Sequence, residues 1–268
     1  MKKNLLIALL TLIVLTGCTN AQEKEDKVIR VGASPTPHSL ILEVAKAEVA
    51  KLGYTLEIIE FTDYILPNTA LDAGDLDANY FQHVPYLTKF NNEKGTKLSS
   101  VLALHFEPLG LYPGKSANLD GLKAGGATVA IPNDPTNEAR ALRLLADNGY
   151  ITLKGGADAN VTPLDIDQNP YNLQFVEIEA ALLAQTLVDV NFAVINGNYA
   201  LGANIASKVL LTEDKDSIAA QTFANIIVVQ TGKENAEKTK ILIQALSSAA
   251  VKKYIEETFY PTVISVLE

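Results

Sequence analysis

The sequence predicts an α/β protein with two lobes, each a mostly parallel sheet flanked by helices, and a ligand cleft between the lobes. Two observations support this fold class. Short apolar runs with strand-like alternation are followed by segments with helical spacing, and this order occurs in two successive blocks. Neither block is large enough to contain all the residues from Val28 onward, so we expect two units that face each other across a cleft.

The first block covers residues 28–106. Gly53 and Gly74 stop two of its helical segments, as glycine commonly does at helix ends. The expected strands are 28–32, 56–61, 76–81 and 101–106. The expected helices are 40–52, 65–73 and 84–92.

The second block covers residues 127–195, and the chain then returns to the first lobe. The expected strands of this part are 127–131, 173–178, 192–195 and 224–229. The expected helical segments are 136–148, 180–188 and 233–259. We therefore assign residues 28–111 plus 224–268 to lobe 1 and residues 112–223 to lobe 2.

The first residues are typical of a lipoprotein signal peptide. Two lysines precede an apolar run, Leu5 to Leu15, which is too short for a bilayer span of about twenty residues. Leu15-Thr16-Gly17-Cys18 resembles the bacterial lipobox, which implies removal of residues 1–17 and acylation of Cys18, the only cysteine. Residues 18–27 then form a polar tether that holds the protein outside the cytoplasm, on a bacterial membrane. The alternative is an ordinary secreted protein with an incidental cysteine.

Composition and charge argue against several classes of function. The 31 acidic and 22 basic residues give a formal charge of −9, which opposes nucleic-acid binding. One cysteine and three scattered histidines, His38, His83 and His105, do not match the ligand sets of common metal sites, so no metal or cofactor is expected. The sequence has no nucleophile-elbow, zinc-protease or phosphate-loop motif, and we expect no catalysis, although its many carboxylates leave a glycosidase open.

The segment from Ile131 to Arg140 points to an anion site. It lies between an expected strand and an expected helix, and Asp134-Pro135 suits an N-cap followed by the first helical residue. Free backbone N–H groups and the Arg140 guanidinium then face the cleft, where they can hold an organic anion. The alternative is a surface helix cap with a solvated arginine, and Asp134 can also neutralise Arg140.

Aromatic residues and a histidine gather at two other strand–helix junctions. Such junctions face the crevice of a doubly wound sheet, so these side chains are candidates for an apolar pocket wall. The candidates are Tyr64, Tyr80, Phe81 and His83. A core role is the alternative for them and is favoured for Tyr86. Asn196 follows the expected strand 192–195 and can orient an amino or carboxyl group, unless Asn196-Gly197 is only a turn.

Several ordered segments together resemble the methionine-binding lipoproteins of bacterial ABC importers, over nearly the whole chain. The segments include Phe61-Thr62-Asp63-Tyr64, Asp77-Ala78-Asn79-Tyr80-Phe81-Gln82-His83, Pro132-Asn133-Asp134-Pro135-Thr136-Asn137 and Val194-Ile195-Asn196-Gly197-Asn198-Tyr199. The resemblance implies a type II-like periplasmic-binding-protein fold, which captures methionine and delivers it to a membrane permease with ATPase subunits. The binding protein itself is expected to be a monomer.

The same resemblance implies roles for individual residues. Arg140 would hold the ligand carboxylate, Asn196 would meet the backbone of the amino acid, and Asn137 belongs to the same set. The methionine side chain would lie among Tyr64, Tyr80, Phe81 and His83. At Glu138 the chain departs from the family pattern, because relatives often carry a smaller residue there. A carboxylate beside the arginine could alter ligand choice.

Other readings of the sequence remain. L-Methionine is the expected ligand, and D-methionine, a methionine-containing dipeptide or another small amino acid are alternatives because members of the family differ in ligand. A surface adhesin or antigen lipoprotein is a rival of another class, in which the acidic exterior and the tether would be the working parts. An enzyme acting on a small amino acid derivative is a third, which nothing in the sequence requires.

Overall fold

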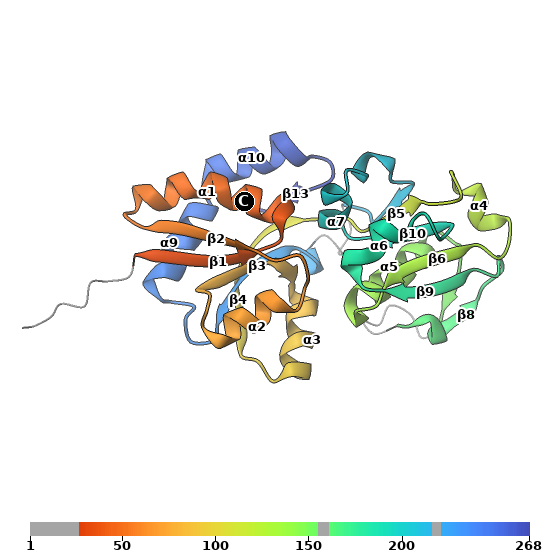
Figure 1. Ribbon diagram of the computed structural model, residues 1–268, viewed down its shortest axis with the longest axis horizontal. Coiled ribbons are helices and arrows are strands. Elements are labelled where there is room, and N and C mark those ends of the chain that lie inside the picture. Colours follow the sequence, from red (N-terminus) through yellow and green to blue (C-terminus); the bar gives the residue numbers. More distant parts are fainter. Residues whose placement is uncertain (1–26, 155–160, 216–220) are drawn as a thin grey trace, which may run out of the picture.

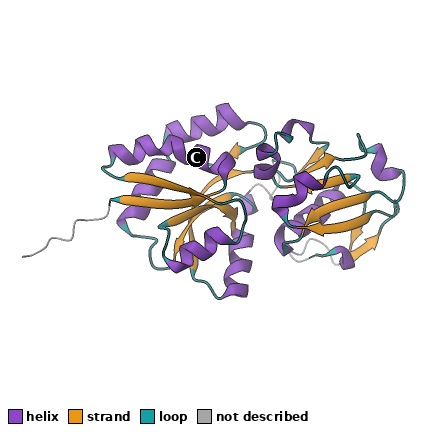
Figure 2. Cartoon of the chain, viewed as in Figure 1, coloured by secondary structure: helices purple, strands orange, loops and turns teal. Residues whose placement is uncertain are grey.

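The computed structural model of the chain describes residues 27–154, 161–215 and 221–268 (Figure 1). Two sheets lie side by side along the long axis of the molecule, each accompanied by helices (Figures 1 and 2). The signal peptide, Cys18 and most of the expected tether lie outside the described residues. Among the described helices, none is long and apolar enough to cross a bilayer.

The first sheet contains six strands. They are β1 (Val28–Ala33), β2 (Thr55–Glu60), β3 (Ala78–His83), β4 (Leu98–Phe106), β12 (Asn225–Gln230) and β13 (Ile264–Ser265). Their order across the sheet is β13-β4-β12-β3-β1-β2. β1 pairs in parallel with β2 and β3, whereas β12 lies antiparallel between β3 and β4. Strands β1 to β4 therefore run in one direction, and the returning strand β12 runs against them.

Helices cover both faces of this sheet (Figure 2). They are α1 (Leu40–Lys51), α9 (Glu237–Leu246) and α10 (Ala249–Phe259) on one face, and α2 (Leu66–Ala73) and α3 (Val84–Lys94) on the other. Alternate residues of β12 reach the two cores: Ile227 packs beneath α1, α9 and α10, and Ile226 packs against α2 and α3. The strand is buried on both faces, which explains why its sequence is a continuous apolar run.

Two of the expected helices differ in detail from the structure. The helical pattern over 233–259 forms two helices, because Ser248 interrupts it and its side chain accepts the N–H of Val251 at the start of α10. The expected helix 180–188 is instead a short turn, η3 (Ala180–Leu182), followed by the short helix α6 (Leu183–Thr186).

The second sheet contains five strands in the order β11-β5-β10-β6-β9. They are β5 (Gly110–Pro113), β6 (Thr128–Pro132), β9 (Gln174–Ile178), β10 (Phe192–Ile195) and β11 (Leu211–Thr212). β6 pairs in parallel with both β9 and β10, and β5 is antiparallel to β10. The helices of this lobe are α4 (Asp120–Lys123), α5 (Pro135–Asp147), α6 and α7 (Gly197–Gly202), and a separate hairpin joins β7 (Thr152–Leu153) to β8 (Ile166–Gln168).

The chain passes between the sheets at two places. Glu107 to Leu109 connect β4 with β5, and the return leads into β12. Because β5 begins at Gly110 and already pairs in the second sheet, the expected lobe boundary after residue 111 falls inside this strand. The exact lobe limits stay a prediction.

Candidate ligand-binding site

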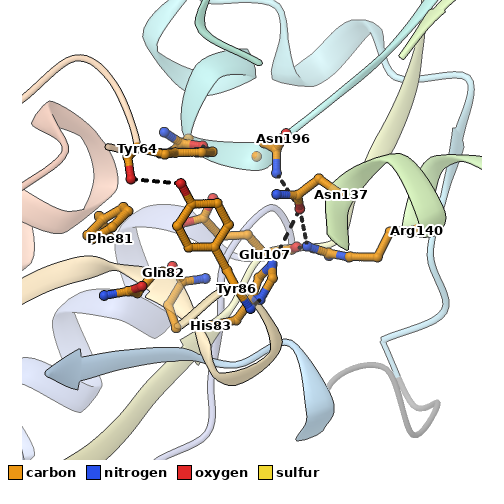
Figure 3. Close-up of a pocket in the computed structure, with 12 residues that line it drawn as sticks. Tyr64, Phe81, Gln82, His83, Tyr86, Glu107, Asn137, Arg140 and Asn196 are labelled. Atoms are coloured by element: carbon orange, nitrogen blue, oxygen red, sulfur yellow. Dashed lines mark hydrogen bonds between the residues drawn. The ribbon is translucent and has the colours of Figure 1, made fainter. Parts of the chain in front are cut away.

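A small cavity lies between the two sheets (Figure 3). Side chains from both lobes form its wall, at the ends of β3 and β10 and the start of α5. The lining residues are Tyr64, Phe81, Gln82, His83, Tyr86, Glu107, Asn137, Arg140, Asn196, Gly197, Asn198 and Asn225. Six of the seven residues expected to bind ligand are among them.

The start of α5 orients the amide of Asn137. Asp134 caps the helix by accepting the backbone N–H of Asn137 at 3.0 Å, and Pro135 occupies the first turn. The Asn137 Nδ2 donates to both oxygens of Asp134 at 3.0 Å, so its Oδ1 faces the cavity. There Oδ1 accepts hydrogen bonds from Arg140 (3.2 Å), Asn196 (3.0 Å) and His83 (3.3 Å), which joins the two lobes (Figure 3).

The Arg140 guanidinium is buried and forms a two-pronged ion pair with Glu213. Nε donates to Oε1 at 2.9 Å and Nη2 to Oε2 at 2.6 Å, and Nη2 also donates to the Glu107 carbonyl at 3.3 Å. The guanidinium carbon lies 4.3 Å from the ring centre of Phe223. With the bond to Asn137, four of its five N–H groups have protein partners, and one on Nη1 remains for a ligand.

The expectation that Asp134 or Glu138 would stand beside this arginine is therefore corrected. Asp134 is occupied by Asn137 and Thr136, and the partner of Arg140 is Glu213. Burial, together with the charges of Glu177 and Asp134, raises the pKa of the Glu138 carboxyl to about 7. Local sequence pattern could not show the pairing, because Arg140 and Glu213 are 73 residues apart.

Asn196 presents an unsatisfied acceptor. It precedes α7 directly after β10, and its Nδ2 donates to Asn137. Its Oδ1 is buried and has no hydrogen-bond partner among the described residues. An unpaired buried carbonyl costs about 1–3 kcal/mol, so this atom is placed to accept a donor from a ligand.

Aromatic rings form the opposite part of the wall. Tyr64 lies with its ring centre 5.8 Å from Phe81, 5.9 Å from Tyr86 and 5.0 Å from Tyr199. Its hydroxyl donates to Asn198 Oδ1 at 2.6 Å, so this bond connects the first lobe with the second. Tyr86, for which a core role was favoured, also lines the cavity.

His83 is a neutral part of the wall. Its Nδ1 accepts the backbone N–H of Tyr86 at 3.2 Å, which caps α3 and leaves the proton on Nε2 for Asn137. Burial and the nearby positive charge of Arg140 lower its pKa to about 3.

Tyr80 does not line the cavity. Its hydroxyl contacts His105 Nδ1, and the side chain belongs to the core beneath α1, α9 and α10. Neighbouring residues of a strand point to opposite faces, and a bulge in the pairing of β3 with β12 leaves Phe81 unpaired beside Tyr80. The two aromatic residues therefore face different surroundings, and grouping them was not justified by the local sequence.

Two lining residues at the crossings between lobes were not singled out from the sequence. Glu107 follows β4, and Asn225 begins β12 opposite His83. Polar residues in the two segments that connect the lobes could have predicted these lining residues, because both segments pass the cleft.

Two of the three histidines, His38 and His105, lie close together. The ring centres of His38 and His105 are 5.0 Å apart, and a hydrogen bond of 2.7 Å joins His105 Nε2 to Glu107 Oε1. Burial lowers the pKa of His38 to about 4 and that of His105 to about 3. His38, His105 and Glu107 are residue types that can hold a metal ion, and their ligand atoms lie within 4.8 Å of one another.

Two α/β lobes that together enclose one polar and aromatic cavity define a substrate-binding protein. The family model of the NlpA lipoproteins matches residues 29–267. The chain belongs to this family, whose members are substrate-binding proteins and not enzymes.

Relatives and solved structures agree with this assignment. A lipoprotein from Ruminococcus gnavus is 51% identical, with a TM-score of 0.87 over 89% of this chain and 99% of that chain. A nutrient-binding protein from Burkholderia cenocepacia bound to methionine is 40% identical, with a TM-score of 0.83 over 89% of this chain and 99% of that chain. The D-methionine-binding lipoprotein MetQ of Salmonella typhi is 41% identical over 257 residues, 94% of this chain and 93% of the relative.

Proposed function

We propose that this chain is the substrate-binding lipoprotein of an ABC importer, which captures L-methionine and delivers it to a membrane permease and its ATPase subunits. The relatives bound to methionine or named for methionine support the ligand class. The signal-peptide pattern and Cys18 support a lipid anchor that holds the protein outside the cytoplasm.

The division of the cavity into a polar and an aromatic part is the observation that carries this proposal. The free N–H on Arg140 Nη1 suits a ligand carboxylate, and the unpaired Oδ1 of Asn196 suits an α-ammonium donor. A flexible thioether side chain fits the rings of Tyr64, Phe81 and Tyr86, because sulfur makes favourable contacts with aromatic edges.

Closure of the lobes provides the mechanism. Tyr64 bonds to Asn198 and the Tyr199 hydroxyl donates to the Thr62 carbonyl at 3.1 Å, so the lobes already meet beside the cavity. A ligand that contacts both lobes stabilises the closed state over an open one through its differential affinity. The permease then recognises the closed, loaded form.

Calorimetry tests the proposal. The full chain would be purified in detergent, stripped of ligand by reversible unfolding, and titrated with L-methionine, glycyl-methionine and leucine. We expect saturable binding of L-methionine alone at one site, weakened by about 1–3 kcal/mol in Asn196→Ala. Refolded protein that gives no heat with any of these ligands would refute the proposal.

D-Methionine is the second candidate ligand, because the Salmonella typhi relative is named for it. The stereoisomers exchange the positions of the α-hydrogen and one of the polar groups, so only one of them places both groups on Arg140 and Asn196. A parallel titration with D-methionine therefore decides between them, and the tighter isomer is the physiological ligand.

A further inference from the structure

We propose that Glu107 is the counter-ion for the α-ammonium of the ligand, so that the cavity selects molecules with a positively charged amino group. The inference deepens the proposed function and rests on it for the presence of a small amino acid in the cavity. It assigns a specificity-determining residue that lies at the crossing from β4 to β5.

The charges around the cavity give the first argument. Among its lining residues, Arg140 is the cation and Glu107 is the carboxylate, because His83 is neutral. The charge of Arg140 is compensated by the ion pair with Glu213, which does not line the cavity. His38 Nε2 lies 3.5 Å from Glu107 Oε1, but burial lowers the pKa of His38 to about 4, so this imidazole is neutral near pH 7. Among the described residues, no lysine or arginine forms an ion pair with Glu107, and a buried carboxylate without a counter-ion is costly.

The position of the carboxylate gives the second argument. Glu107 lies under the turn that begins with Asn196, and the backbone N–H of Asn198 bonds to it. A Cβ at Gly197 would lie 2.9 Å from Glu107 Oε2, so glycine is what lets the carboxylate approach this turn. Asn196 Oδ1, the acceptor without a partner, belongs to the same turn. An ammonium group here meets a neutral acceptor and a carboxylate, and it has three N–H donors to share.

Burial raises the pKa of the Glu107 carboxyl, whereas the charges of His38 and Arg140 and the backbone N–H of Asn198 act in the opposite direction. The positive charge of a ligand ammonium group beside it would likewise favour the carboxylate form. In the carboxylate form, Glu107 Oε1 accepts the Nε2 proton of His105, and His105 Nδ1 accepts the proton of the Tyr80 hydroxyl. The 2.7 Å separation of His105 Nε2 and Glu107 Oε1 is that of a hydrogen bond.

A comparison of two ligands isolates the charge. L-Methionine and its hydroxy analogue, 2-hydroxy-4-(methylthio)butanoate, share the carboxylate, the thioether and a hydrogen-bond donor at the α-carbon, but only methionine carries a positive charge there. In the wild-type chain we expect methionine to bind at least about a hundredfold more tightly. The neutral donor satisfies Asn196 Oδ1 in both ligands, so the difference measures the counter-ion.

The variant Glu107→Gln then tests the residue. We expect methionine affinity to fall by about thirtyfold or more and the preference over the hydroxy analogue to shrink to less than about tenfold. Glu138→Gln is the matched control, because it neutralises another buried glutamate outside the cavity and leaves the preference unchanged. If Glu107→Gln does not fold, Glu107→Asp keeps the charge but withdraws it by one methylene, and it reduces the preference in the same direction.

The outcomes separate this inference from the proposed function. Wild-type protein that binds methionine but accepts the hydroxy analogue equally well overturns the counter-ion. A folded Glu107→Gln chain that keeps the full preference overturns it as well. Absence of methionine binding in the wild-type chain instead overturns the proposed function.

Discussion

Two buried charges border the cavity, and the protein surrounds them in opposite ways. Arg140 has a full counter-ion in Glu213, whereas Glu107, whose pKa is raised by burial, has neutral partners in the imidazole of His105 and the N–H of Asn198. Arg140, which the sequence pattern predicts as the anion-binding residue, is therefore the residue whose charge Glu213 already compensates. The charge that a cavity offers to a ligand depends on partners that lie outside it.

Removal of the arginine is expected to produce the largest effect. Arg140→Ala leaves Glu213 buried without its partner, so we expect a loss of about 3–5 kcal/mol in the free energy of unfolding, measured with urea. Methionine affinity falls by about 2–5 kcal/mol in calorimetry of the folded variant. Unchanged stability would mean that Glu213 does not depend on Arg140, and unchanged affinity would remove the arginine from the ligand site.

Acid is expected to weaken the fold through the histidines that surround the second charge. The pKa of His38 is about 4 and those of His83 and His105 are about 3, below the unfolded value of 6.5. As the pH falls below 6.5 the unfolded chain takes up protons that the folded chain excludes, so stability is lost progressively down to about pH 4. We expect the free energy of unfolding to decrease by at least about 2 kcal/mol between about pH 7 and pH 5.

Glu138 provides the check on this pH dependence. The raised pKa of its carboxyl acts in the opposite direction, because the folded chain takes up this proton near pH 7, before the unfolded chain does. Glu138→Gln should therefore be more stable than the wild type at neutral pH and lose stability more steeply on acidification. A shallower loss in this variant contradicts the assignment.

Loss of the unpaired amide affects ligand binding more than the fold. Asn196→Ala removes an acceptor that has no partner among the described residues, so we expect methionine affinity to drop by about 1–3 kcal/mol with little change in stability. Calorimetry and thermal unfolding of the same preparation measure both quantities. Should stability fall as much as affinity, the bond to Asn137 would be the main role of Asn196.

The smallest effect is expected at Tyr80, and it separates that residue from its neighbour. Tyr80→Phe removes a hydroxyl that contacts His105 in the core, so methionine affinity should change by less than about threefold. Phe81→Ala opens the aromatic wall and should weaken binding by about tenfold or more. Titration of both variants with methionine gives the answer, and a larger effect at Tyr80 would place it in the ligand site after all.

Much of the candidate site follows from the order of residues along the chain. Asn137 and Arg140 lie in the first turns of a helix after a strand, Asn196 follows a strand directly, and Phe81 and His83 end one. Strand ends of α/β lobes meet at the cleft, so local pattern was sufficient to bring these residues together. Tyr80 is the exception, because neighbouring residues of a strand point to opposite faces and Tyr80 faces the core, while the bulge in the pairing with β12 adds to its separation from Phe81.

The sequence by itself determined the two α/β blocks, the signal-peptide pattern and the presence of polar and aromatic residues at strand ends, because these depend on short-range periodicity and composition. Only the tertiary structure decided which charges are compensated. Glu213 reaches Arg140 across 73 residues, and His38, which follows β1, lies with its Nε2 3.5 Å from Glu107 Oε1. The ion-pair partner of a charged side chain is determined by proximity in the folded structure. In the low-dielectric interior, that partner determines the net charge that the cavity wall presents to a ligand.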